Sequence, residues 1–233
     1  MIQALSTAAS GGRAMLQRID AAAHNLANAR TTAFKRSRPE FAEILGGGAR
    51  QVASLRLTEQ GPLESTGRAL DLAVDGEGYF RVRQARTGEI LYTRAGHFLP
   101  DSEGRLATPR GAVLEPEIRV AGFARVVVAE DGRVSGETAD GRSVELGRIV
   151  LARFFDAARL EEAEPGLYRS AAPPTDGPAG RILQGRLEQS NVDVIRELTD
   201  LVAAHRALEI NGKLIEAADE ALRAVNGLRR SNA

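Results

Sequence analysis

The sequence lacks cysteine and tryptophan, and aromatic residues make up only 4% of the chain. Without cysteine it forms no disulfide and carries out no thiol chemistry. The few aromatics argue against a platform that stacks sugars or bases. Basic and acidic residues balance at 31 each, so no net charge draws the chain to nucleic acid or to an acidic substrate. No apolar run approaches the roughly 20 residues of a membrane span, and we expect neither membrane insertion nor a cleavable secretory signal.

The first 30 residues carry an apolar stripe that predicts a helix. Spacings of three and four residues separate most members of the stripe, with Gly12 in the one empty slot: Ile2, Leu5, Ala9, Leu16, Ile19, Ala23 and Leu26. This spacing is heptad-like. The segment "NARTT" then supplies stop signals. We expect residues 38–45 to form a short helical continuation and the glycines at 46–48 to form a hinge.

From about residue 50 to residue 180 the pattern changes to short β-type runs. Asp-Gly pairs at 75–76, 131–132 and 140–141 separate apolar or alternating segments, and a further turn falls at 102–104. Asp-Gly between such segments is a strong hairpin signal, because tight hairpin turns need positive φ angles. The middle of the chain therefore predicts an antiparallel β domain, which a linker rich in proline and glycine closes at 170–181.

The C-terminal segment carries the most regular pattern. Six aliphatic residues lie seven apart: Leu187, Val194, Leu201, Leu208, Ile215 and Leu222. Leu198 joins them at the alternate position of the heptad. A helix over 192–228 would be about 55 Å long and has to bury its stripe against another element. We therefore predict an α+β fold, in which long N- and C-terminal helices pair as a coiled coil beside a central antiparallel all-β domain. The predicted division is 1–45 plus 183–233 for the helical domain, 46–69 for the hinge and 70–182 for the β domain.

No pattern in the sequence predicts catalysis. His24, His97 and His205 share no ligand spacing of the kind that zinc sites show. Residues 75–78 imitate part of a calcium loop but lack its acidic ladder. We predict no enzyme activity, no cofactor and no metal.

Both ends of the chain resemble the axial proteins of the bacterial flagellum, in the rod and hook group. The N-terminal segment "NLANARTTAFKR" is similar to the group's signature at Asn25, Leu26, Ala27, Asn28, Thr31, Thr32, Phe34 and Lys35, whereas Ala33 replaces the usual glycine. The C-terminal segment "LEQSNVDVIREL" resembles the second signature at Leu187, Glu188, Ser190, Asn191, Val192 and Glu197, and Arg206, Ala207, Glu209, Asn211 and Lys213 extend the match. The segments "GPLESTGRALDLAVDGEGYFRV" and "YTRAGHFLPDSEGRL" are typical of the group's β region. The C-terminal motif resembles the distal rod subunit most, and "TTAFKRSRPEFAEIL" also resembles the proximal subunit.

The resemblance implies a structural subunit of the basal-body rod. Such a subunit polymerises through its terminal helices into the drive shaft that crosses the periplasm and transmits torque to the hook. The implied partners are many copies of the chain itself, other rod and hook proteins, the P- and L-ring proteins as a bushing, and the flagellar type III export apparatus. The implied location is the flagellar basal body, reached without a cleavable signal peptide.

The predicted assembly interface follows the two stripes and the asparagines beside them. It comprises Leu5, Leu16, Ile19, Asn25, Leu26, Asn28, Leu187, Asn191, Val194, Leu198, Leu201, Leu208, Asn211, Ile215 and Leu222. Asn25 and Asn28 lie three apart on one helical face, and buried amides in a crowded interface would fix its register. The alternative is that both are helix-stop residues.

Two other functions stay open on the sequence alone. One is a non-flagellar binding module that forms a coiled-coil dimer and carries a β domain. The other is a secreted hydrolase on a β scaffold, which needs a clustered polar pocket that the sequence does not show. Sedimentation at low and high concentration separates a discrete dimer from a polymer.

Overall fold

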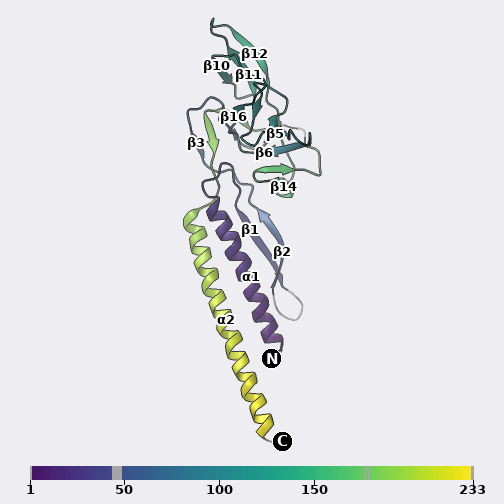
Figure 1. Cartoon of the computed structure of the whole chain (residues 1–233), viewed down its shortest axis with the longest axis vertical. Coiled ribbons are helices and arrows are strands. Elements are labelled where there is room, and N and C mark those ends of the chain that lie inside the picture. Colours follow the sequence, from purple (N-terminus) through teal and green to yellow (C-terminus); the bar gives the residue numbers. More distant parts are fainter. Residues whose placement is uncertain (1, 44–48, 176, 178, 232–233) are drawn as a thin grey trace. The chain divides into compact units, whose positions relative to one another are not determined.

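The computed structural model describes residues 2–43, 49–175, 177 and 179–231 (Figure 1). Its internal contacts divide the chain into two compact units. The helical unit comprises residues 1–29, 36–57 and 192–233, and the β unit comprises residues 30–35 and 58–191. Each unit therefore contains segments that are far apart in the sequence.

Two helices and one hairpin build the described part of the helical unit. Helix α1 spans Ile2–Ala27 and helix α2 spans Val194–Ser231. Strands β1 (Ser37–Glu43) and β2 (Ala49–Arg56) pair antiparallel, and α1 packs against both α2 and this hairpin (Figure 1). Among the described residues, no helix combines the length and the apolar character that a membrane span requires.

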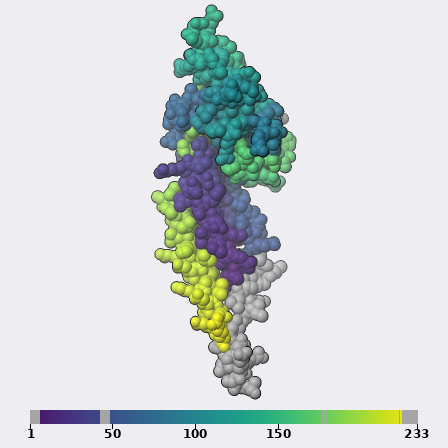
Figure 2. Space-filling model, in the orientation of Figure 1, coloured from purple at the N-terminus to yellow at the C-terminus, as the bar shows by residue number. Residues whose placement is uncertain are grey.

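Small residues form the contact between the two helices. Ala14 and Ala22 of α1 and Ala204 of α2 are buried. Gly11 faces the side chain of Asn211, so closely that a Cβ added at Gly11 would lie 3.5 Å from the Asn211 amide oxygen. These small side chains allow the helices to lie close together (Figure 2).

The predicted coiled coil is wrong, and so is the fold class that rested on it. A coiled coil inserts its aliphatic ridge into the partner helix. In α2 the buried positions are instead Glu197 and Ala204, three residues away from the aliphatic row, while Val194 and Leu198 are exposed. In α1, likewise, Leu16 of the predicted stripe is 48% exposed. Leu201, Leu208 and Ile215 of the row are partly buried, and Leu208 lies against Gly12 of α1. The fully buried positions of this contact are nevertheless alanines and not interlocking aliphatic side chains.

The segment that follows α1 also differs from the expectation. Residues 38–43 are part of strand β1 rather than a helical continuation, and residues 49–56 of the expected hinge form β2. The strands form a ladder that pairs Ser37 with Arg56 and Glu43 with Ala49. This tertiary pairing overrides the local helical pattern. The expected glycine hinge at 46–48 lies outside the described residues.

The β unit is built from antiparallel strands. They are β3 (Leu63–Ser65), β4 (Leu72–Asp75), β5 (Tyr79–Arg83), β6 (Ile90–Thr93), β7 (Leu99–Pro100), β8 (Leu106–Ala107), β9 (Val113–Leu114), β10 (Arg125–Val128), β11 (Arg133–Glu137), β12 (Ser143–Arg148), β13 (Leu151–Ala152), β14 (Glu161–Glu164), β15 (Leu167–Arg169), β16 (Arg181–Gln184) and β17 (Arg186–Glu188). A 3-10 turn, η1, covers Ala157–Arg159.

In the described part of the β unit there are four sheets, and three of them contribute residues to one main core. The largest has eight strands in the order β14-β15-β6-β5-β9-β8-β7, with β13 paired to β5. Strands β10-β11-β12 form a second sheet, and β16-β4 and β17-β3 form two-stranded sheets. Phe80 and Phe98 meet edge to face in the core, with their ring centroids 5.3 Å apart.

The Asp-Gly turns have two different outcomes. Gly132 and Gly141 have positive φ angles and connect β10 to β11 and β11 to β12, as the hairpin signal predicts. Gly76 also has a positive φ angle, but it lies between β4 and β5, which belong to different sheets. The hairpin expected there is therefore wrong. The division at 45/46, 69/70 and 182/183 stays a prediction about which pieces fold alone, and 182/183 falls inside β16.

Candidate assembly site

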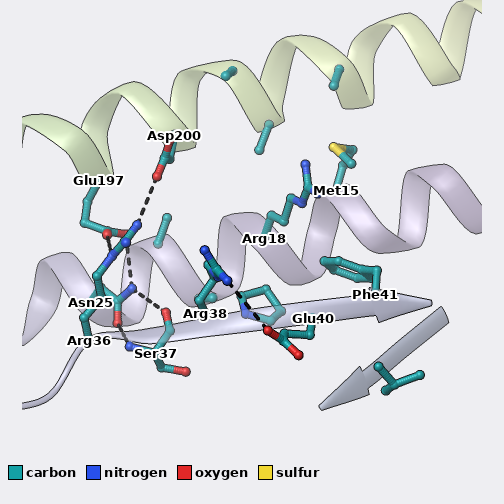
Figure 3. A pocket seen from close by; sticks show the side chains of 17 residues that line it. Met15, Arg18, Asn25, Arg36, Ser37, Arg38, Glu40, Phe41, Glu197 and Asp200 are labelled. Carbon is teal, nitrogen blue, oxygen red and sulfur yellow. Dashed lines mark hydrogen bonds and ion pairs between the residues drawn. The ribbon is translucent and has the colours of Figure 1, made fainter. Parts of the chain in front are cut away.

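The side chain of Asn25 joins three elements of the helical unit. It is 1% exposed. Its Nδ2 donates to the backbone oxygen of Ser37 at 2.8 Å and to Oε2 of Glu197 at 3.1 Å, and its Oδ1 accepts from the Ser37 N–H at 2.9 Å (Figure 3). Because this position both donates and accepts, an amide satisfies it and a carboxylate does not. One buried amide thus holds α1, β1 and α2 together.

Arg36 completes the same polar cluster. Its Nε donates to Oε1 of Glu197, and its Nη2 donates to Oδ2 of Asp200 at 3.1 Å (Figure 3). The Glu197 carboxylate is buried and therefore accepts from both an amide and a guanidinium. A buried carboxylate needs such partners, because its removal from water costs several kcal/mol.

Asn28 has a different role from Asn25. It is partly exposed, and its Nδ2 donates to the backbone oxygen of His24 at 2.9 Å. That carbonyl lies in the last turn of α1 and also accepts from the Asn28 backbone N–H at 3.2 Å, so the side chain and the backbone of Asn28 both bind the end of the helix. These bonds fit the helix-stop alternative for Asn28. A role of either asparagine in contacts between copies stays a prediction.

A second buried ion pair lies in the β unit. Nζ of Lys35 lies 2.5 Å from Oε1 of Glu188 and donates to the backbone oxygen of Glu59 at 2.7 Å. Glu188 is fully buried, accepts from the Gly61 N–H at 3.0 Å, and has Nη1 of Arg94 at 3.6 Å. Burial lowers the pKa of Lys35, and the Glu188 carboxylate opposes this shift. The pair fixes both side chains inside the unit.

The C-terminal segment that contains Glu188 also binds the backbone on both sides of residue 34. Ala33 adopts a left-handed φ of 58°, and its N–H donates to the backbone oxygen of Glu188 at 2.8 Å. The Asn191 N–H donates to the Phe34 oxygen at 3.3 Å. The left-handed turn is therefore kept although alanine replaces glycine, at a cost of about 1–2 kcal/mol. Within the β unit, the two sequence motifs from opposite ends of the chain bind each other.

Other charged pairs in the β unit are also structural. Nδ1 of His97 lies 2.6 Å from Oδ1 of the buried Asp71, and Nε of Arg68 donates to its Oδ2 at 2.8 Å. Burial alone would raise the pKa of the Asp71 carboxyl, but hydrogen bonds from Thr66, His97 and Arg68 hold it below its ordinary value. Within the part of the chain that the structure describes, no group of three or more histidine or acidic side chains could hold a metal ion.

The structure distributes the predicted interface residues over three environments. Leu16, Val194 and Leu198 are exposed. Partly buried are Ile19, Leu26, Asn28, Asn191, Leu201, Leu208, Asn211 and Ile215. Asn25 is buried in the helical unit, and Leu187 is buried in strand β17 of the β unit. The side chains of Leu5 and Leu222 lie outside the described part.

Four aliphatic side chains form an exposed apolar patch at the start of α2. Val194, Ile195, Leu198 and Val202 are between 43% and 78% exposed. Their spacing places them on one side of the helix, away from the buried Glu197 and Ala204. We call these four residues the apolar patch. Aliphatic groups clustered on a helix surface mark an interaction site more often than single exposed ones do.

Sequence reasoning missed the four charged residues that hold the motifs in place. Lys35, Arg36, Glu188 and Glu197 are all buried and paired. Lys35, Glu188 and Glu197 carry the family resemblance, and that was the available signal. Their pairing was not predictable, because Lys35 and Glu188 are 153 residues apart in the sequence.

Comparisons with known proteins match the chain along nearly its whole length. Residues 73–136 match a family model described as the flagellar hook protein FlgE/F/G D1 domain, and residues 183–228 match one described as the flagellar basal body rod FlgEFG protein C-terminal region. The chain is 32% identical to the flagellar basal-body rod protein FlgG of Borreliella burgdorferi, over 99% of this chain and 100% of the relative. It is 35% identical to FlgG of Caulobacter vibrioides, over 98% and 100%. It is 32% identical to FlgF of the same bacterium, over 93% of each chain.

Proposed function

The chain belongs to the family of FlgG-like flagellar basal-body rod proteins, and on this premise we propose that its helical unit is the part through which copies polymerise. The family identity and the absence of an enzymatic role, both predicted from the sequence, are confirmed. The chain is a structural subunit of the flagellar rod. A non-flagellar binding module is not favoured.

The exposed aliphatic rows carry this proposal. Leu16 on α1 and Val194 and Leu198 of the apolar patch on α2 belong to the stripes that the sequence predicts, yet they are exposed in the single chain. Burial of apolar surface yields about 25 cal/mol per Å². In a rod, neighbouring copies would supply the cover that the chain itself does not. We retain Leu16, Ile19, Leu26, Val194, Leu198, Leu201, Leu208 and Ile215 as the proposed contact surface.

The finer assignments rest on the family. Self-assembly and contact with other rod and hook components follow from membership. We propose in addition that the P- and L-ring proteins surround the assembled chain, that the type III apparatus exports it, and that the rod lies in the periplasm and transmits torque to the hook. The match to FlgG over 98–100% of both chains supports the distal position.

Substitution of the apolar patch tests the proposal. Ile195→Asp places a carboxylate at a site that is exposed in the monomer and covered in the rod. We expect normal secretion and no rods in basal-body preparations from cells that carry this variant. Arg142→Asp, in an exposed turn of the β unit, is the matched control and should allow assembly. Normal rods built from the Ile195 variant would contradict the proposal.

A further inference from the structure

We propose that a groove in the helical unit is the acceptor for the apolar patch of a second copy of the chain. The inference rests on the proposed polymerisation of the helical unit and names the contact that produces it. The groove has a volume of about 690 Å³ and lies between α1, α2 and the β1–β2 hairpin (Figure 3). That volume is within the roughly 300–1,000 Å³ of protein ligand sites.

The lining of the groove suits an incoming helix. Met15, Phe41 and Val52 contribute larger apolar side chains, and small residues complete the surface: Ala21, Ala22, Ala203, Ala204 and Ala207. Alanines allow a second backbone to approach closely. The guanidinium of Arg18 lies 5.3 Å from the centre of the Phe41 ring, which leaves a basic group beside the apolar lining. The groove thus offers apolar contact beside charged side chains of both signs, with Arg18 next to Phe41 and with Glu40 and Asp200 also in the lining.

The apolar patch has the anchor pattern that such a groove binds. Ile195, Leu198 and Val202 occupy positions i, i+3 and i+7 of α2, which is the spacing of helices that dock into apolar grooves. Glu209 lies on the same side of the helix two turns further on and is exposed. Its carboxylate complements the basic Arg18. One segment of the chain therefore matches the groove in spacing, apolar character and charge.

The patch and the groove lie on opposite sides of the same helix. Each residue advances about 100° around the axis, so Leu198 of the patch and Ala207 of the groove, nine residues apart, point about 180° from each other. Ile195 and Ala204 have the same relation. A contact from patch to groove therefore leaves each pair of copies with one free groove and one free patch. Such a heterologous contact extends without closing, as a rod requires, whereas contact between two patches would end at a dimer.

The absence of cysteine allows a direct test by disulfide trapping. Rods are isolated from cells whose only copy of the subunit carries Leu198→Cys and Ala207→Cys, and they are treated with a mild oxidant. Nine residues along a helix separate these positions by about 13 Å. A disulfide needs Cα atoms within about 7 Å, so every disulfide must join two copies. We expect a ladder of multimers on a non-reducing gel.

The controls separate the possible failures. Leu198→Cys combined with Arg142→Cys should give no ladder. The pair Val194→Cys and Ala203→Cys, whose side chains are both exposed in the single chain, provides a second test if the first variant does not assemble. Intact rods without a ladder from either groove pair would overturn the groove assignment and leave the proposed function standing. A dimer from Leu198→Cys alone would show patch-to-patch contact and would also overturn it. Unsubstituted chains that build no rod in the same cells would instead contradict the proposed function.

Filling the groove gives an independent readout. Ala207→Leu places a larger side chain where the patch of the neighbour would lie. We expect loss of motility and of rods, with secretion and helical circular dichroism unchanged. Adding Leu198→Ala to the same chain makes room and should restore part of the assembly. Normal rods from Ala207→Leu would contradict the inference.

Discussion

Phe80 and Phe98 pack edge to face inside the β unit, whereas the buried side chains of the helical unit are alanines, an amide and an ion pair. The β unit encloses its large apolar residues, among them Leu72, Leu91 and Leu114. The helical unit buries none of its described large aliphatic side chains fully and leaves several exposed, among them Leu16, Ile195 and Leu198. Because burial of apolar surface is the dominant favourable term in folding, the β unit contains its own source of stability, and we expect the helical unit to gain stability from the proposed contacts with other copies.

The largest expected difference is in the stability of two fragments of the β unit. Residues 58–191 contain all strands of the β unit that the structure describes, and we expect this fragment to unfold cooperatively in urea. Residues 70–182 omit β3 and β17 and part of β16, so we expect a lower midpoint. Equal midpoints would support the sequence-based boundaries instead.

Two alanine substitutions compare a buried side chain of the β unit with an exposed side chain of the helical unit. Phe98→Ala removes a fully buried side chain, and we expect it to destabilise the monomer by about 3–5 kcal/mol. Leu198→Ala removes an exposed one and should change monomer stability by less than about 0.5 kcal/mol, yet reduce rod assembly. Urea unfolding and electron microscopy of basal bodies provide the measurements. A large loss of monomer stability from Leu198→Ala would show that the chain itself covers the patch.

Substitutions at the neighbouring residues Arg36 and Lys35 compare the buried ion pair of the helical unit with that of the β unit. Arg36→Met leaves the Glu197 carboxylate with only the Asn25 amide, and we expect a loss of about 3–5 kcal/mol, seen as reduced helical circular dichroism. Lys35→Met leaves Glu188 with Arg94 and the Gly61 N–H. Here we expect about 1.5–3 kcal/mol, seen in the unfolding of the β unit. The reverse order of effects would contradict our account of these pairs.

The smallest expected effect is at Ala33. Replacement by glycine removes the cost of a left-handed φ, and we expect about 0.5–1 kcal/mol of added stability. Ala217→Gly in α2, where the backbone is helical, is the matched control and should lose about 1 kcal/mol. Thermal unfolding of both variants measures the difference. A loss at Ala33 would mean that the turn carries no strain.

The sequence predicted the features that depend on local chemistry. The Asp-Gly turns at 131–132 and 140–141 connect hairpins because the turn geometry selects those residues. The family followed from motifs at both ends of the chain. A helical stripe, in contrast, shows which face is apolar but not which chain covers it. For this reason the pattern at Val194 and Leu198 suggested an internal coiled coil that the structure does not have.

The remaining errors came from partners distant in sequence. Residues 38–43 have a helical pattern, but strand β2 supplies hydrogen bonds that a helix would otherwise make internally. The ion pair of Arg36 with Glu197 joins residues 161 apart. Periodicity and capping rules describe neighbours along the chain, so they contain no information about such pairs. Asn25 was singled out from the sequence for a role between copies, which stays a prediction, and the three bonds that the structure shows for its side chain lie within the chain.

The position of the apolar patch and the groove on opposite sides of α2 gives an assembly a direction. In a row of copies joined from patch to groove, one terminal copy displays an empty groove and the other displays an uncovered patch. The two termini are therefore chemically different, and a subunit can recognise one and ignore the other. A protein that offers a patch but no groove would stop such a row, and one that offers a groove alone would start it. On the proposed contact, the polarity of the filament follows from the opposite orientation of the two surfaces about the axis of α2.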